Sequence, residues 1–175
     1  TDGNNRAIKT VWHRSLHDAG AYGSDLVSSI IGQSRAFSFP KSLYSTKDAI
    51  MAVVRNNKNA LIVDFFAGSG TTLHAVNLLN AEDSGHRRCI LVTNNEVSVD
   101  EARDLQRDGY QPGDLEWEKH GICRAVTWPR TKYSILGKRD DGTVLTGEYF
   151  TNQTVTKEVD RSFYQLGFVE NPTEL

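Results

Sequence analysis

The residues best suited to chemistry form a turn of small residues between two regular elements: Asp64-Phe65-Phe66-Ala67-Gly68-Ser69-Gly70-Thr71-Thr72. The apolar run 60–63 before it predicts a buried strand, and the spacing of Leu73, Val76 and Leu79 after it predicts a helix. A strand, a glycine turn and a helix in this order place a ligand against backbone N–H groups at a helix N-terminus. Glycine is needed because a Cβ would hold the ligand away from the backbone. The stretch therefore predicts a site for a nucleotide-like cofactor.

The residues after the glycines narrow the choice of cofactor. A triphosphate-binding loop needs a lysine after its last glycine, but Gly70 is followed by Thr71 and Thr72. A dinucleotide fingerprint needs a third glycine where this chain has Leu73. S-adenosylmethionine has no phosphate; it needs polar groups near the turn and a carboxylate for its ribose hydroxyls. The turn therefore favours S-adenosylmethionine, with a nicotinamide cofactor as an alternative.

Two carboxylates end the two predicted strands. Glu96 directly follows the second apolar run, 88–93, where it can hold the ribose. The alternative for Glu96 is an exposed acid at a helix N-terminus. Asp64 ends the first strand, where it either orients the cofactor's amino group or shapes the turn.

The elements that must position these residues are predicted from hydrophobic periodicity and turn residues. Helices are expected at 24–32, 46–55, 99–108 and 122–136, an extended segment at 37–43, a loop at 109–121 and a hairpin turn at 140–143. Ser24 is the candidate cap of the first helix, and Pro129 must begin, kink or interrupt the last. Two apolar strands joined by a helix form a βαβ unit, which implies an α/β fold: a parallel sheet with helices on its faces.

Length, charge and cysteine content limit the class of protein. We expect one compact domain from 175 residues. The net charge of −2 gives no overall attraction to nucleic acid, although a local basic face would suffice. Cys89 and Cys123 are predicted to be buried, reduced thiols, with a disulfide or a metal site as the alternative. No apolar run reaches the ~18 residues of a transmembrane helix and no signal peptide is visible, so we expect a cytoplasmic protein with no membrane partner.

Other polar clusters are weaker candidates. The basic run 86–88 either contacts DNA phosphates or forms a solvated loop. Arg130 follows a tryptophan that is expected to pack, and is itself expected on the surface, with a DNA contact as the alternative. His13, His17 and Asp18 have a metal-like spacing, but no further ligand completes the set, so no metal site is expected.

The order of the motifs resembles that of the β-class DNA adenine-N6 methyltransferases, in particular the modification subunits of type III restriction systems. The stretch 64–72 is similar to the family's cofactor motif. Residues 39–43 are similar to the segment that closes over the methionine part of the cofactor, and 92–96 to the motif whose acid holds the ribose. Residues 10–12 also resemble the segment that precedes these motifs. The resemblance extends over about 10–147.

The resemblance implies a Rossmann-like methyltransferase fold that binds S-adenosyl-L-methionine. The cofactor-binding residues that it implies are Pro40, Lys41, Ser42, Asp64, Phe65, Phe66, Ala67, Gly68, Ser69, Gly70, Thr71, Thr72, Asn94, Asn95 and Glu96. Among them Lys41, with Ser42 and Thr71, is expected near the methionine carboxylate; the alternative for Lys41 is an ordinary surface lysine. The expected division is a lead-in at 1–36, a cofactor-binding core at 37–147 and a C-terminal extension at 148–175.

The family's catalytic motif, Asp or Asn followed by two prolines and an aromatic residue, is missing. The prolines are Pro40, Pro112, Pro129 and Pro172, and no two are adjacent. In this class the motif and the target-recognition region precede the cofactor motif. The resemblance therefore implies a C-terminal portion of such an enzyme, with no catalytic residue of its own. Its implied partners are the N-terminal catalytic half, double-stranded DNA and, within a restriction system, a restriction subunit.

The predicted function is thus the S-adenosylmethionine-binding part of a site-specific DNA adenine-N6 methyltransferase. The alternative from another class is a stand-alone S-adenosylmethionine-binding regulatory module without catalysis. If the chain is a fragment and its sheet normally continues into an N-terminal half, some strand edges or apolar faces would be uncovered. Uncovered edges tend to pair with a second chain, so we expect self-association.

Overall fold

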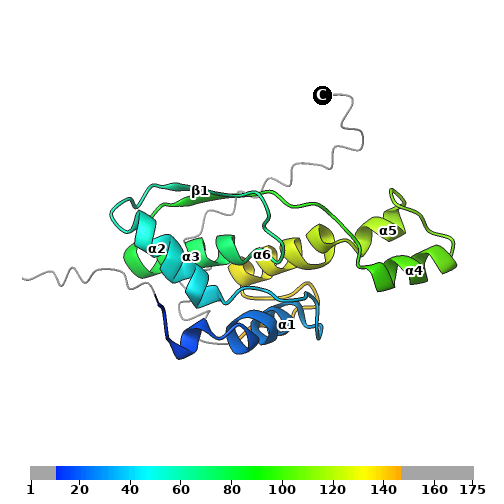
Figure 1. The fold of residues 1–175 in the computed structure, drawn as a ribbon, viewed down its shortest axis with the longest axis horizontal. Coiled ribbons are helices and arrows are strands. Elements are labelled where there is room, and N and C mark those ends of the chain that lie inside the picture. Colours follow the sequence, from blue (N-terminus) through cyan, green and yellow to red (C-terminus); the bar gives the residue numbers. More distant parts are fainter. Residues whose placement is uncertain (1–10, 147–175) are drawn as a thin grey trace, which may run out of the picture.

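The computed structural model describes residues 11–146, in which helices cover one face of a small sheet (Figure 1). The elements in chain order are η1 (Ser15–His17), η2 (Gly20–Asp25), α1 (Leu26–Ile31), α2 (Leu43–Val54), β1 (Leu61–Asp64), α3 (Thr71–Asp83), β2 (Arg88–Leu91), α4 (Val99–Arg107), α5 (Leu115–Lys119), η3 (Cys123–Thr127) and α6 (Trp128–Leu136). Helix α3 packs against α2, β2 and α6, and α1 packs against α6. Helices α4 and α5 extend away from the sheet at one end (Figure 1).

The predicted βαβ unit is confirmed. β1 and β2 are parallel neighbours, with Leu61 opposite Arg88 and Asp64 opposite Leu91. The pairing continues beyond the strands, because the amide N of Ala67 donates to the carbonyl of Val92 at 3.1 Å. The carboxyl ends of both strands, and the segments that follow them, therefore lie at one edge of the sheet.

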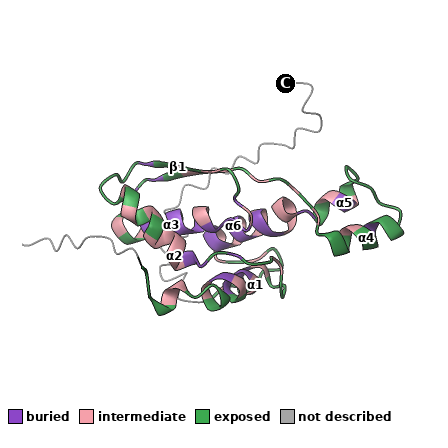
Figure 2. Cartoon of the chain, viewed as in Figure 1, coloured by how far each residue is buried: buried purple, intermediate pink, exposed green. Residues whose placement is uncertain are grey.

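The prediction that both strands are buried is wrong for the described part of the chain. Leu61, Val63 and Ile90 are 50%, 43% and 47% exposed, and alternate residues of each strand are only half-buried (Figure 2). Side chains alternate between the two faces of a strand. Within residues 11–146 the helices cover one face only (Figure 1), so every second apolar side chain is left open.

The core lies on the covered side of the sheet. Its buried members are Leu26, Ile30, Leu43, Ala75 and Leu78, which come from α1, α2 and α3. This cluster includes residues from both sides of the boundary expected at residue 36. The described part of the lead-in segment therefore packs into the same core as the expected cofactor-binding region.

Helix α2 begins at Leu43, three residues before the predicted start at Thr46. Its cap explains the difference. Ser42 accepts a hydrogen bond from the amide N of Ser45 at 3.4 Å, and its own hydroxyl donates to the carbonyl of Leu16 at 2.9 Å. Serine is a favoured helix cap, because its oxygen satisfies a free amide of the first turn.

Two other helix predictions and one loop prediction need adjustment. The helix expected at 24–32 begins earlier, as η2, and Ser24 makes no cap bond there; it ends as predicted at Gly32, whose φ is +83°. The loop expected at 109–121 contains α5. The helix expected at 122–136 is formed by η3 and α6, with Pro129 in the first turn of α6, where a missing N–H does no harm.

The remaining predictions concern turns, thiols and the ends of the chain. The hairpin at 140–143 is confirmed by an antiparallel bridge between Lys138 and Val144. Cys89 and Cys123 are free thiols, as predicted, but both are only partly buried. The extension predicted at 148–175 lies outside the described residues. Within 11–146 no helix combines the length and the apolar composition needed to cross a bilayer.

Arg87 corrects the prediction of a basic loop at 86–88. Its side chain is buried, and both terminal nitrogens donate to the carboxylate of Asp83 at 2.9 Å. Asn80 bonds both the amide N and the carbonyl of Arg87, at 3.0 and 2.9 Å. Arg87 therefore fixes the passage from α3 to β2 and is not free to contact DNA phosphates.

We expect Asp83→Asn to lower the free energy of unfolding by about 1 kcal/mol, because the buried guanidinium loses a charged acceptor that is itself partly solvated. The hydrogen bond from Arg87 holds the pKa of Asp83 below its ordinary value of 3.8. The contribution of Asp83 is therefore present above pH 3.8 and is lost as the pH falls below it. Denaturant unfolding at neutral and acid pH measures this difference. The control is Asp100→Asn, which removes an exposed pair with Arg103; equal stability of Asp83→Asn and wild type at neutral pH would contradict the prediction.

The open face of the sheet predicts self-association of this chain. Val63 and Ile90 are opposite one another in register, so Val63→Thr with Ile90→Thr removes adjacent apolar surface and keeps good strand formers. We expect sedimentation velocity to show association of the wild type and a shift toward monomer in the double variant. Val53→Thr, on the exposed surface of α2, is the control and should change nothing. A monodisperse wild-type monomer would contradict the prediction.

Candidate functional site

The glycine turn joins β1 to α3 at the carboxyl edge of the sheet. Gly68 and Gly70 have φ of +48° and +76°, a region of backbone conformation that favours glycine. The amide N of Gly70 donates to the carbonyl of Ala67 at 2.7 Å and closes the turn. The cap residue of α3 is Gly70, which has no side chain to bond the free amides of the first turn. The amides of its first turn are therefore available to an acceptor from outside the helix.

Asp64 holds the turn together. One carboxylate oxygen accepts from the amide N of Phe66 at 3.0 Å, and the other accepts from the hydroxyl of Thr72 at 2.5 Å. Both oxygens are thus engaged on either side of the glycines. These are the contacts of an aspartate that shapes a turn, the second of the two roles considered for Asp64.

Glu96 follows β2 at the same edge and is exposed. Its carbonyl accepts from the amide N of Ile122 at 2.9 Å, which fixes the backbone. Its carboxylate accepts from the amide nitrogen of the Asn94 side chain at 3.1 Å, and within residues 11–146 it forms no ion pair. The position of Glu96 is therefore set by its backbone, and its negative charge is open to a ligand.

Asn95, expected to contact the cofactor, ties the segment after β2 to the helices that follow. Its side-chain nitrogen donates to the carbonyl of Glu118 at 2.8 Å and to the carboxylate of Glu118 at 2.7 Å. Its side-chain oxygen accepts from the amide N of Arg124 at 3.1 Å. A Cβ on Gly121 would lie only 2.2 Å from Asn95. Glycine at 121 is therefore required for this contact, which the sequence reading missed.

The segment that contains Pro40, Lys41 and Ser42 approaches the turn at Phe37. The ring of Phe37 is 3.1 Å from where a Cβ of Gly68 would be, whereas the carbonyl of Pro40 is 2.6 Å from where a Cβ of Gly23 in η2 would be. Pro40 and Ser42 are buried, whereas Lys41 is exposed. Ser42 has a structural role as the cap of α2, and Lys41 provides a solvent-facing ammonium group on this segment.

Three large aromatic side chains near these segments are exposed. They are Phe39, Phe65 and Phe66, with Phe39 and Phe66 more than nine-tenths exposed. Phe39 also has an unusual φ of +56°. Exposed aromatic rings beside a ligand-type turn provide apolar surface for a planar group.

The prediction that Arg130 lies on the surface is wrong: its side chain is 0% exposed. One terminal nitrogen, Nη1, donates to the carbonyl and hydroxyl of Ser69 at 3.2 and 2.9 Å, and to the hydroxyl of Thr71 at 2.7 Å. The hydroxyl of Thr127 donates to the carbonyl of Gly68. Thr127, Arg130 and Ser134 share the inward stripe of the last helix, at i, i+3 and i+7. This polar stripe at helical spacing is the sequence signal that could have indicated that Arg130 is buried.

The charge of Arg130 has no counter-ion among the described residues, and its Nε and Nη2 atoms have no hydrogen-bond partner there. Burial lowers the pKa of Arg130 to about 9, because the charged form loses hydration. Burial, and then the charge of Arg130, lower the pKa of His74 well below its ordinary value. The turn is therefore backed by a buried positive charge.

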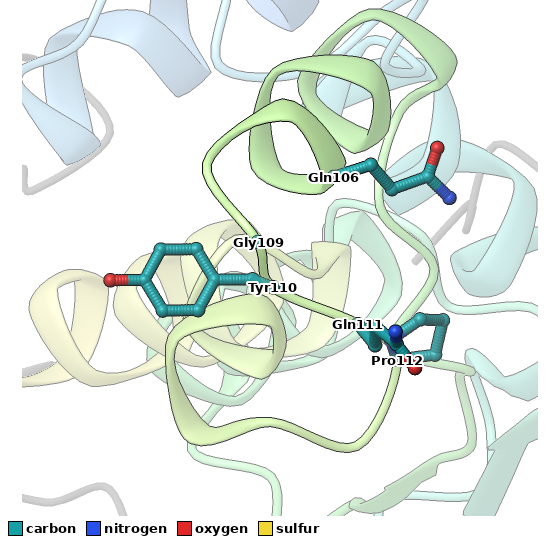
Figure 3. Close-up of a pocket in the computed structure, with 5 residues that line it drawn as sticks. All are labelled: Gln106, Gly109, Tyr110, Gln111 and Pro112. Carbon is teal, nitrogen blue, oxygen red and sulfur yellow. The ribbon is translucent and has the colours of Figure 1, made fainter.

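Two other features lie away from this edge. His17, which has a metal-like spacing with His13 and Asp18, has its Nε2 atom 2.9 Å from the carboxylate of Asp48. Within residues 11–146 no group of three potential ligands could hold a metal ion. A cavity of about 320 Å³ at the end of α4 is lined by Gln106, Gly109, Tyr110, Gln111 and Pro112 (Figure 3). None of these residues belongs to the predicted site, and the ring of Tyr110 points away from Gln106 (Figure 3).

Comparison with known proteins identifies relatives. The chain is 37% identical over 91 residues to the type II methyltransferase M.KpnI of Klebsiella pneumoniae, covering 50% of this chain and 20% of that protein. It is 31% identical over 103 residues to the type III EcoPI Mod subunit of Escherichia phage P1, covering 59% and 15%. It is 47% identical over 57 residues to the StyLTI Mod subunit of Salmonella typhimurium, covering 33% and 8%.

These relatives are much longer, since this chain spans no more than a fifth of any of the three. The family described as DNA methylase, of the N6 and N4 type, matches residues 1–104, more than half of the chain. The match includes the glycine turn and Glu96. The resemblance inferred from the motifs is thus confirmed, and the chain belongs to the DNA methylase family.

Proposed function

We propose that this chain binds S-adenosylmethionine at the carboxyl edge of β1 and β2, as the methyl-donor side of a site-specific DNA adenine-N6 methyltransferase. The observation that carries the proposal is the turn between β1 and α3. Its left-handed Gly68 and Gly70 precede helix α3, and Glu96, with its open carboxylate, follows the neighbouring parallel strand. Membership of the DNA methylase family and the names of the type III Mod relatives support it. The expected core, 37–147, contains all of these residues.

The described residues fit the parts of this cofactor. Glu96 offers a carboxylate to the two ribose hydroxyls, and such charged hydrogen bonds are among the stronger ones. The first turn of α3 offers N–H groups and a positive helix end to the methionine carboxylate. Lys41 adds a cation on the neighbouring segment. The exposed rings of Phe39 and Phe66 offer apolar surface to the adenine.

In the proposed reaction the cofactor supplies a methyl group activated by a positive sulfur. The residues of this chain bind and orient it: the turn fixes one end and Glu96 fixes the ribose. Precise positioning of the two reactants accounts for much of the rate of such a transfer. The target adenine must leave the duplex to reach the methyl group. Because no two prolines are adjacent in this chain, we assign the activation of adenine to the N-terminal half of the enzyme.

We expect Glu96→Gln to weaken binding of S-adenosylhomocysteine about tenfold, because the charged acceptor for the ribose is lost. The melting temperature should not change, since the side chain is exposed. Isothermal titration calorimetry measures the affinity. Glu116→Gln, a partly exposed acid on α5 that pairs with Lys119, is the control and should bind as the wild type does. Equal affinities of Glu96→Gln and wild type would contradict the assignment of Glu96.

We expect the chain alone to transfer no labelled methyl group to DNA. When the chain is mixed with an N-terminal half that carries the catalytic motif, we expect labelled methyl groups to appear on DNA. Methylation by the chain alone would show that the missing motif is not essential. A chain that binds S-adenosylhomocysteine but stays inactive with the other half would favour a stand-alone binding module. Binding of NADH without S-adenosylhomocysteine would favour the nicotinamide alternative.

A further inference from the structure

We propose that Arg130 is a positioning residue for the cofactor: it fixes the turn 67–71 from α6 and places an uncompensated positive charge behind the first turn of α3. The charge would hold the carboxylate of the cofactor's methionine part. This inference rests on the proposed function and names the residue that determines one part of the same site.

Hydrogen bonds from Arg130 and from its neighbour Thr127 hold the glycine turn in place. A single nitrogen of Arg130 bonds three oxygens of Ser69 and Thr71, the residues on either side of Gly70. Three residues earlier, Thr127 bonds the carbonyl of Gly68. The turn is therefore held from behind along its whole length. The family match ends at residue 104, so this support comes from a part of the chain beyond the matched stretch.

The charge of Arg130 supports the same role. A buried charge is strongly destabilising unless it is paired, and among residues 11–146 all the hydrogen-bond acceptors of Arg130 are neutral. Asp64 is the carboxylate of the turn, but it is engaged by Phe66 and Thr72. The positive end of the α3 dipole adds to the field at the same place. In a medium of low dielectric constant such a charge acts across the thin turn on an anion bound at the other side.

A competing account is that Arg130 only braces the turn. The two accounts differ in what they predict for ligands with and without a carboxylate. A brace supports every ligand of the turn equally, whereas a positive charge favours the ligand that carries a carboxylate. S-adenosylhomocysteine and 5′-methylthioadenosine share the adenosine and the thioether sulfur, but the second lacks the amino-acid end. The ratio of their affinities therefore separates the two accounts.

The experiment measures both affinities by calorimetry for the full chain and for Arg130→Met and Arg130→Lys. For Arg130→Met we expect a loss of about tenfold or more for S-adenosylhomocysteine, and less than about threefold for 5′-methylthioadenosine. Arg130→Lys keeps the charge and loses the planar fork, so it should retain most of the preference for the carboxylate. Ile135→Ala, a buried change on the same helix, is the control for loosened packing and should leave the ratio unchanged.

Each outcome either supports or overturns the proposed role of Arg130. An equal loss for both ligands in Arg130→Met, or no loss, overturns the proposal. If Arg130→Met does not fold, Arg130→Lys decides: a retained preference supports the charge, and a lost preference overturns it. If the wild type binds neither ligand, the proposed function itself fails. Failure of the proposed function is thus read from the wild type, and failure of this inference from the variants.

Discussion

β1 and β2 run parallel, so the chain must return through α3 before the second strand can begin. That constraint brings the residues that follow each strand to one edge of the sheet. The glycine turn after Asp64 and the segment that ends in Glu96 meet there, although they are far apart in the sequence. The bond between Ala67 and Val92 extends the pairing into the turn itself. Every later feature of the candidate site, including the placement of the Phe37 segment and of α6, depends on this shared edge.

The turn is supported from two sides that contribute different chemistry. The segment around Phe37 packs an aromatic ring against Gly68. On the other side, Thr127 at the end of η3 and Arg130 of α6 bond the carbonyls and hydroxyls of the turn. A left-handed glycine turn is flexible by itself, because glycine has little conformational preference. Fixing it from both sides gives the first turn of α3 a defined position. The buried guanidinium contributes positive charge as well as rigidity, at the cost of burying a cation without a counter-ion.

The parts that were predictable from sequence are local. The strand, glycine turn and helix depend on periodicity and on glycine conformation, so 60–83 could be read directly. Arg130 was not placed correctly from sequence because its partner Ser69 in the glycine turn lies 61 residues earlier in the chain. Arg87 pairs with Asp83 only four residues earlier, and the sequence pattern did not show that this pair is buried where α3 passes into β2. The strands were expected to be buried because they are apolar. Their exposure depends on what covers the second face, which strand composition does not specify.

Asp64 and Glu96 illustrate how geometry separates two residues that the sequence treats alike. Both are acids at the ends of adjacent strands, and each was open to a ligand role and a structural one. The short side chain of Asp64 returns to the amide two residues on, a local bond that aspartate makes readily, and Thr72 takes its other oxygen. At Glu96 the backbone provides the anchoring, through Ile122 and the neighbouring Asn95, and the longer side chain reaches into solvent. One carboxylate is thereby consumed in building the turn, and the other retains a charge that a ligand with two hydroxyls can use.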